Sequence, residues 1–211
     1  RASSEAGIRC LSLYVFSTEN WRRAVEEVGF LMGLVSIHLE RELGFYQELD
    51  LRVVHSGDPS GLPREVRRSL ERVTTLTASH LGMVVNLALN HGGRDEILRA
   101  AAKWAAAGTE GPITEEAFRR HLDRPELPDL DLLIRTGGEL RLSNFLLWQG
   151  AYAELHFSPK LWPDFTAEDL HAALEEYARR ERRFGAVTPA SPAPLAALEH
   201  PPRQARSLRA W

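Results

Sequence analysis

The stretch LDLLIRTGGELRLSNFLLWQGAYAELHF, residues 130–157, decides the fold class. Its first apolar run, residues 130–134, predicts a buried strand, and a polar turn rich in glycine and arginine follows directly. Residues 143–148 predict the start of a helix, and residues 153–157 predict another strand. Strands that alternate with helical segments in this way are typical of a parallel sheet covered by helices.

The same alternation continues upstream and downstream of that stretch. Further strands are predicted at residues 8–16, 51–54 and 83–89, and helices at residues 26–49, 63–79, 94–107, 114–122 and 166–183. The whole pattern predicts an α/β fold with a central, mostly parallel β-sheet flanked by α-helices.

Composition limits the function classes. The chain has 211 residues, 44% of them apolar and 26% charged, which suits one soluble domain with a sizeable core. Its formal net charge of −3 argues against bulk nucleic-acid binding. The single Cys10 excludes an internal disulfide and a cysteine-based metal cluster, so a reducing, cytoplasmic setting fits. No apolar run approaches the length of a membrane span.

The two ends of the chain differ in character from its middle. Residues 186–211 are rich in proline and alanine and cannot build a core, so we expect a C-terminal tail after a domain at residues 1–185. The chain begins with Arg1 rather than methionine and runs almost directly into a predicted buried strand. We therefore expect an N-terminally incomplete domain.

A polar turn follows each of the first four predicted strands, at residues 17–23, 55–58, 90–94 and 135–144. The carboxyl ends of parallel strands lie at one edge of the sheet, and open α/β sheets bind their ligands there. The sequence therefore predicts that these turns converge on one cleft. His91, next to a glycine pair in the third turn, is expected to face it.

The fourth turn has the composition of a diphosphate site. Arg135 and Arg141 supply forked donors that match phosphate oxygens. Gly137 and Gly138 let backbone amides approach an anion closely, and Ser143 would open a helix with free N–H groups at its start. The alternative is a solvated turn with ordinary helix caps.

Two other positions also leave a choice open. Glu154 lies in the otherwise apolar run 151–157, so its carboxylate must either bind a cation, with Mg²⁺ the natural choice near phosphates, or pair with an arginine. In the first turn, Arg23 could bind phosphate and Asn20 could orient a substrate. The alternative there is helix capping and packing by Trp21.

Four segments together resemble one known family. They are LSLYVFSTENWRR (residues 11–23), NLALNHGGRDEI (86–97), DLLIRTGGELRLSNFLLWQGAYAELHFSPKLWPDF (131–165) and RERRFG (180–185). They are similar to the signatures of the cis-prenyltransferases, the family of undecaprenyl and decaprenyl diphosphate synthases. The resemblance covers about residues 8–185 in order and without large gaps.

The resemblance implies an enzyme that transfers prenyl groups. It would condense isopentenyl diphosphate with an allylic diphosphate, using Mg²⁺, to give a polyprenyl or short-chain Z-prenyl diphosphate. It implies a cytoplasmic homodimer with the undecaprenyl diphosphate synthase fold, no nucleic-acid partner, and peripheral membrane contact through the lipid product. The helix around residues 31–39 would form one wall of a tunnel for the growing chain.

The resemblance also implies roles for individual residues. Arg135, Arg141, Leu142 and Ser143 would bind the diphosphate of isopentenyl diphosphate, and Glu154 would help to hold Mg²⁺. Asn20 matches the catalytic position often assigned to proton removal. A neutral amide is a very poor proton acceptor, so orienting the substrate or relaying a proton to a diphosphate oxygen is chemically easier. The remaining substrate contacts would come from Ser17, Thr18, Glu19, Trp21 and Arg23.

Three departures from the family pattern matter. The family's first strand and the Asp-Gly-Asn-Gly-Arg-Trp type phosphate loop after it are missing, which raises the alternative of an inactive fragment. His91 stands where the family commonly has tyrosine, and the turn at residues 55–58 is slightly longer than usual. A non-catalytic partner subunit is a second alternative, but such subunits usually lose the Glu-Asn-Trp stretch and the paired arginines that this chain keeps.

Overall fold

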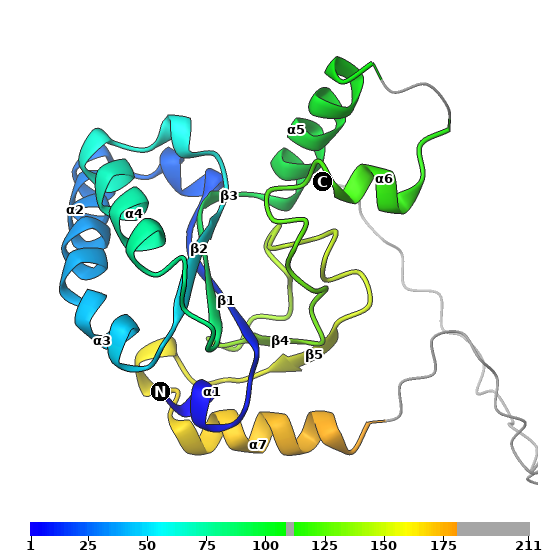
Figure 1. The fold of residues 1–211 in the computed structure, drawn as a ribbon. Coiled ribbons are helices and arrows are strands. Elements are labelled where there is room, and N and C mark those ends of the chain that lie inside the picture. The colour runs from blue at the N-terminus through cyan, green and yellow to red at the C-terminus, as the bar shows by residue number, and fades with distance from the viewer. Residues whose placement is uncertain (109–111, 181–211) are drawn as a thin grey trace, which may run out of the picture. The chain divides into compact units, whose positions relative to one another are not determined.

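The strands of the protein form two parallel sheets (Figure 1). The computed structural model describes residues 1–108 and 112–180, and its helices and strands all belong to the unit Arg1–Ala178. The larger sheet has the order β1-β3-β2 and the smaller one pairs β4 with β5. Their bounds are Cys10–Ser17 for β1, Arg52–Ser56 for β2, Val84–His91 for β3, Leu132–Arg135 for β4 and Glu154–Phe157 for β5.

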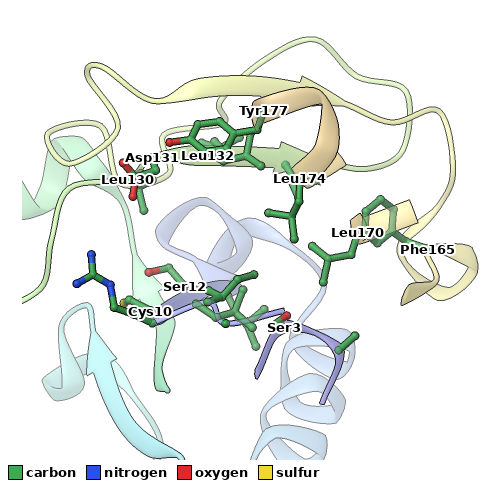
Figure 2. Close-up of a pocket in the computed structure, with 18 of the residues that line it drawn as sticks. Ser3, Cys10, Ser12, Leu130, Asp131, Leu132, Phe165, Leu170, Leu174 and Tyr177 are labelled. Atoms are coloured by element: carbon green, nitrogen blue, oxygen red, sulfur yellow. The ribbon is translucent and has the colours of Figure 1, made fainter. Parts of the chain in front are cut away.

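The predicted α/β class and parallel pairing are confirmed, whereas the single sheet is not. Within the described residues, no strand pairing joins the larger sheet to the smaller one. Between β1 and β4 lies a cleft of about 550 Å³ that α7 (Ala167–Ala178) also lines. Figure 2 shows Leu170 and Leu174 of α7 on one side of this cleft and Cys10 and Ser12 of β1 on another.

Helices cover both sheets (Figure 1). α4 packs against α2 and against β2, and α5 packs against α6. Besides α7, the helices are α1 (Ala2–Glu5), α2 (Val25–Arg41), α3 (Leu43–Glu48), α4 (Arg64–Leu76), α5 (Gly93–Ala106) and α6 (Glu115–Arg119), with short 3₁₀ turns at Thr18–Arg22, Pro59–Gly61 and Trp162–Asp164. No helix in the described part of the chain is both long and apolar enough to cross a membrane.

The hydrophobic core forms where the apolar face of a helix packs against the larger sheet. In α4, Val66, Leu70 and Val73 recur at helical spacing and are buried against the larger sheet. β3 is the central strand of that sheet, and nearly all of its residues are buried. Burying each large apolar side chain stabilises the fold by about 1.5–3 kcal/mol. The core therefore fixes β3, whose carboxyl end enters the polar part of the molecule.

Several predicted element ends need correction. The long helix predicted at 26–49 is divided at Glu42 into α2 and α3. The short helix after Thr114 has the expected cap, with the Ala117 N–H donating to Thr114 Oγ1 at 3.2 Å, but it already ends at Arg119. The predicted C-terminal tail, residues 186–211, and the end of the last predicted helix lie outside the described residues.

The helix predicted at residues 143–148 does not form, and turns take its place. Ser143, Asn144 and Leu146 have φ values of 50°, 62° and 40°, which a right-handed helix excludes. The start of α5 holds this segment instead. The Gly93 N–H donates to Asn144 O at 2.6 Å, and the Arg94 N–H donates to Asn144 Oδ1 at 2.9 Å. Tertiary hydrogen bonds thus override the local helical preference.

Candidate active site

Three of the four predicted polar turns meet at the carboxyl ends of the strands. Ser17 at the end of β1 aligns with His91 at the end of β3. The fourth turn reaches β1 through a hydrogen bond from Tyr14 Oη to Ser143 O at 3.1 Å, and it reaches the first turn through one from Asn144 Nδ2 to Glu19 Oε1 at 2.8 Å. The second turn, residues 55–58, lies beside the end of β3 but does not line the pocket described next.

The end of β1, the first turn and the fourth turn line a polar pocket of about 680 Å³. It brings together seven of the residues that the sequence predicts for the site: Ser17, Glu19, Asn20, Arg23, Arg135, Arg141 and Ser143. The rest of its lining comes from Tyr14, Val15, Phe16, Glu139 and Asn144. Chain segments more than a hundred residues apart in sequence therefore share one site.

Three predicted contact residues lie beside the pocket rather than in its lining. Trp21 donates from Nε1 to Asn90 Oδ1 at 2.7 Å and packs edge-on against Phe16, so the packing alternative describes it. Thr18 donates from Oγ1 to Glu19 Oε2 at 3.2 Å. The side chain of Leu142 is half-buried.

The pocket's positive charge gathers around one carboxylate. Arg135 and Arg141 both pair with Glu139, and Arg135 Nη1 also donates to Ser143 Oγ at 2.7 Å. Hydrogen bonds from Arg135 and Arg141 hold the pKa of Glu139 below its usual range. Glu139 is not among the residues predicted for the site, although its position between the two predicted anion-binding arginines was a usable signal.

The two glycines of the fourth turn do not present their amides to the pocket. The Gly137 N–H donates to Lys160 O at 2.7 Å, and the Gly138 N–H donates to Ser158 O at 2.9 Å. Their φ values of 89° and 73° show that glycine is needed for the left-handed backbone of the turn. The amides of these two glycines are therefore engaged within the fold, and the donors that this turn directs into the pocket are arginine side chains.

Asn20 is oriented by a capping box at the end of β1. Its Oδ1 accepts a hydrogen bond from the Ser17 N–H at 2.8 Å. With the carbonyl oxygen engaged, the amide hydrogens are what Asn20 has to offer inside the pocket. This geometry agrees with a donor that orients a substrate. Arg23, the cation predicted to bind phosphate in this turn, pairs with Glu27 at 2.7 Å, and both side chains are exposed.

Glu154 does not lie with the arginines. It begins β5 and aligns with Leu132 at the start of β4, whereas Arg135 at the end of β4 aligns with Phe157. The two residues thus stand at opposite ends of the strand pair, and Glu154 is absent from the pocket lining. The expectation that Glu154 faces the same phosphates is not met within this chain.

A second, buried polar cluster lies behind the pocket. His91, Glu96 and Asp123 bring potential metal ligands within 4.8 Å of one another. Asp123 already accepts from Arg99 Nη2 at 2.8 Å, and Glu96 accepts from Gln149 Nε2 at 3.1 Å. Because a guanidinium beside these carboxylates opposes a further cation, the cluster is better suited to structure than to metal binding.

Burial sets the protonation of this cluster. His91 is fully buried, so the expectation that it faces the cleft is wrong, and burial lowers its pKa to about 4. Burial raises the pKa of Glu96. The Asp123 carboxylate keeps a lowered pKa because the hydrogen bonds and charge of Arg99 outweigh its burial.

The fold and pocket together are typical of α/β enzymes that bind a phosphorylated substrate at the carboxyl edge of a sheet. Residues 1–185 match the family described as putative undecaprenyl diphosphate synthase. An isoprenyl transferase of Treponema denticola is 50% identical over 185 residues, which cover 88% of this chain and 81% of the relative.

Two solved structures extend the likeness. A probable undecaprenyl diphosphate synthase from Campylobacter jejuni has a TM-score of 0.81 and 39% identity, over 87% of this chain and 86% of that one. Lavandulyl diphosphate synthase from Lavandula x intermedia, in complex with dimethylallyl diphosphate, has a TM-score of 0.84 and 38% identity, over 87% and 82%. The chain belongs to the undecaprenyl diphosphate synthase family, and its activity is that of a cis-prenyltransferase.

Proposed function

We propose that the pocket binds isopentenyl diphosphate through Arg135 and Arg141 and joins it to an allylic diphosphate. The observation that carries this assignment is the convergence of both arginines on the carboxylate of Glu139 within the pocket. Two guanidinium groups held around one anion form a ready-made site for a diphosphate. In the free protein, Glu139 acts as the internal anion of that site.

A diphosphate competes well with this internal carboxylate. It carries more negative charge and more acceptor oxygens, so it satisfies more of the guanidinium donors. Ser143 Oγ, which already accepts from Arg135 Nη1, adds a hydroxyl donor beside the same arginine. Arg135 also has a buried Nε–H for which the described residues supply no acceptor. Binding would therefore exchange Glu139 for the substrate's oxygens.

The other wall of the pocket suits the chemistry of the chain-forming step. The allylic C–O bond breaks, the double bond of isopentenyl diphosphate attacks the allylic carbon, and a proton leaves to give the new cis double bond. Asn20 orients the substrate with its amide hydrogens, and a diphosphate oxygen accepts the proton. Val15 and Phe16 supply apolar surface beside the reacting carbons, which limits the access of water.

Tyr14 serves this wall as a hydrogen-bond donor. Burial raises the pKa of Tyr14 to about 12, so its hydroxyl stays protonated at neutral pH. It can therefore keep donating to Ser143 O, the contact that joins β1 to the fourth turn.

Magnesium fits the pocket through carboxylates of the pocket itself. Glu19 and Glu139 both line it, and Mg²⁺ usually binds one or two carboxylates together with phosphate oxygens. When bound, the ion would neutralise charge on the departing diphosphate. Glu139, displaced from the arginines by substrate, would be free to take this second role. Glu154, the ligand that the resemblance implies, lies at the other end of the β4–β5 pair from Arg135 and outside the pocket lining.

Further parts of the proposal come from the sequence. The resemblance supports a homodimer and peripheral membrane contact through the lipid product. The single Cys10 fits a cytoplasmic location, and composition supports a catalytic domain at residues 1–185 followed by a tail.

Equilibrium binding of labelled isopentenyl diphosphate tests the assignment of the pocket. We expect saturable binding by the 211-residue chain and competition by inorganic diphosphate. A matched variant, Arg67→Ala on the exposed face of α4, should bind as the unaltered chain does, because it removes one arginine far from the pocket. Folded protein that binds neither compound would overturn the proposal.

A further inference from the structure

The segment that carries Ser143 is conformationally demanding. Ser143, Asn144 and Leu146 all have left-handed backbones, and a bulky residue such as Leu146 rarely adopts one. Such conformations persist where surrounding contacts determine them, and they gather at functional sites. The contacts that hold residues 143–146 therefore decide where Ser143 stands relative to Arg135.

Three of these contacts act on the first half of the segment. Tyr14 Oη donates to Ser143 O, while the Gly93 and Arg94 N–H groups donate to the backbone and side-chain oxygens of Asn144. The glycines at the start of α5 permit this approach. A Cβ on Gly92 would lie 2.8 Å from Asn144 Nδ2 and 2.5 Å from Thr18 Oγ1.

The second half of the segment is held from inside the protein. The Leu146 N–H donates to His91 Nε2 at 3.3 Å, and both residues are buried. Phe145 stacks on Tyr14 at 4.5 Å and meets the His91 ring edge-on at 6.2 Å. With Nε2 as the acceptor, the proton of the neutral imidazole lies on Nδ1, which is 4.0 Å from Asp123 Oδ2.

We propose that His91 is a positioning residue for the diphosphate site: through the Leu146 N–H it fixes the segment 143–146, and so places the Ser143 hydroxyl beside Arg135. His91 does not line the pocket and acts through Ser143. This role rests on the proposed function of the pocket. It assigns a task to a residue that stands where the family commonly has tyrosine.

Two substitutions distinguish the effect of the acceptor atom of His91 from the effect of the size of its ring. His91→Phe keeps an aromatic side chain and removes the acceptor, whereas His91→Gln offers a carbonyl oxygen close to the position of Nε2. We expect His91→Phe to weaken binding of inorganic diphosphate about five- to tenfold, which corresponds to the strength of one hydrogen bond. His91→Gln should restore most of that loss.

A double-substitution cycle provides the readout that a merely structural role would not move. In a Ser143→Ala background, His91→Phe should weaken diphosphate binding by less than twofold, because the hydroxyl that it positions is gone. Equal effects of His91→Phe in both backgrounds, or unaltered binding by folded His91→Phe, would overturn the role. If the unaltered chain bound no diphosphate, the proposed function of the pocket would fail instead.

A measurement on the unaltered protein keeps the proposal testable if His91→Phe does not fold. Nitrogen-15 NMR of the histidine side chains reports which ring nitrogen carries the proton. The proposal requires His91 to be protonated at Nδ1 and bare at Nε2. A proton on Nε2 at neutral pH would exclude the bond from Leu146 and contradict the proposal.

Discussion

The two arginine–carboxylate clusters near the ends of the strands differ in exposure and in saturation. Around Glu139, Arg141 is largely exposed and the carboxylate itself is in contact with solvent. Around Asp123, the carboxylate side chain is 7% exposed and is held by Arg99 and by the Gly57 N–H. The exposed cluster can exchange partners with a ligand, whereas the buried one has its partners within the fold. Exposure therefore distinguishes the charged residues that we propose bind a ligand from those that stabilise the fold.

The largest effect should come from breaking the buried cluster. Asp123→Ala should lower the free energy of unfolding by about 3–5 kcal/mol, because Arg99 would lose its buried partner. Asp129→Ala, which removes the exposed partner of Arg119, is the matched control and should change stability by less than about 1 kcal/mol. Urea unfolding measures both, and equal effects would erase the distinction between the clusters.

The exposed cluster should show the reverse behaviour. Arg135→Ala and Arg141→Ala should each weaken isopentenyl diphosphate binding by about 1.5–3 kcal/mol, the range for hydrogen bonds to charged groups. Calorimetric titration measures this loss, and unfolding of the Arg141 variant should change little because its side chain is exposed. Unchanged isotherms for both variants would remove this turn from the binding site.

The buried cluster should also make stability depend on pH. Burial lowers the pKa of His91 from 6.5 to about 4, with Asp123 and Asp95 opposing the shift and Arg99 and His55 adding to it. The unfolded chain takes up this proton first, so His91 contributes stability above pH 6.5 that is lost as pH falls toward 4. Between pH 7.5 and 5 we expect a loss on the order of 2 kcal/mol.

Urea unfolding at the two pH values checks this contribution. For His91→Phe, the free energy of unfolding should differ less between pH 7.5 and 5, by about 2 kcal/mol, since the substitution removes the titrating ring. Identical pH dependence in the two proteins would show that His91 is not held neutral by its surroundings.

The smallest effect should come from the carboxylate of the exposed cluster. Glu139→Gln removes the internal anion, so without magnesium it should bind inorganic diphosphate several-fold more tightly than the unaltered chain. Adding magnesium should increase the diphosphate affinity of the variant less than it increases that of the unaltered chain, because the variant lacks one proposed ligand of the ion. Binding titrations with and without magnesium measure both effects. Weaker binding without magnesium would show that Glu139 organises the arginines rather than occupying their site.

The sequence predicted the positions of the strands, because hydrophobic periodicity is a local signal. It also predicted that four polar turns converge, because the carboxyl ends of parallel strands share one edge of a sheet, and three of the four do. It did not predict the environments of Glu139 and His91. The role of Glu139 depends on the conformations of the Arg135 and Arg141 side chains, which both pair with it. His91 is buried among residues that lie far away in the sequence, such as Asp123 and Leu146.

The left-handed segment at residues 143–146 likewise could not be predicted from local sequence patterns. Its residues favour a helix by themselves, but the hydrogen bonds that decide its shape come from Tyr14, His91 and the start of α5. Likewise, each strand was recognisable, while the division into two sheets depends on pairing between distant segments.

The most direct test of the account is incorporation of labelled isopentenyl diphosphate onto farnesyl diphosphate in the presence of magnesium, with products separated by length. It should be run on this chain and on a version lengthened upstream to match its relatives, each with its Arg135→Ala variant. We predict prenyl products that Arg135→Ala abolishes in whichever version is active. No product from either version, with both folded and both binding isopentenyl diphosphate, would contradict it and favour a non-catalytic partner subunit.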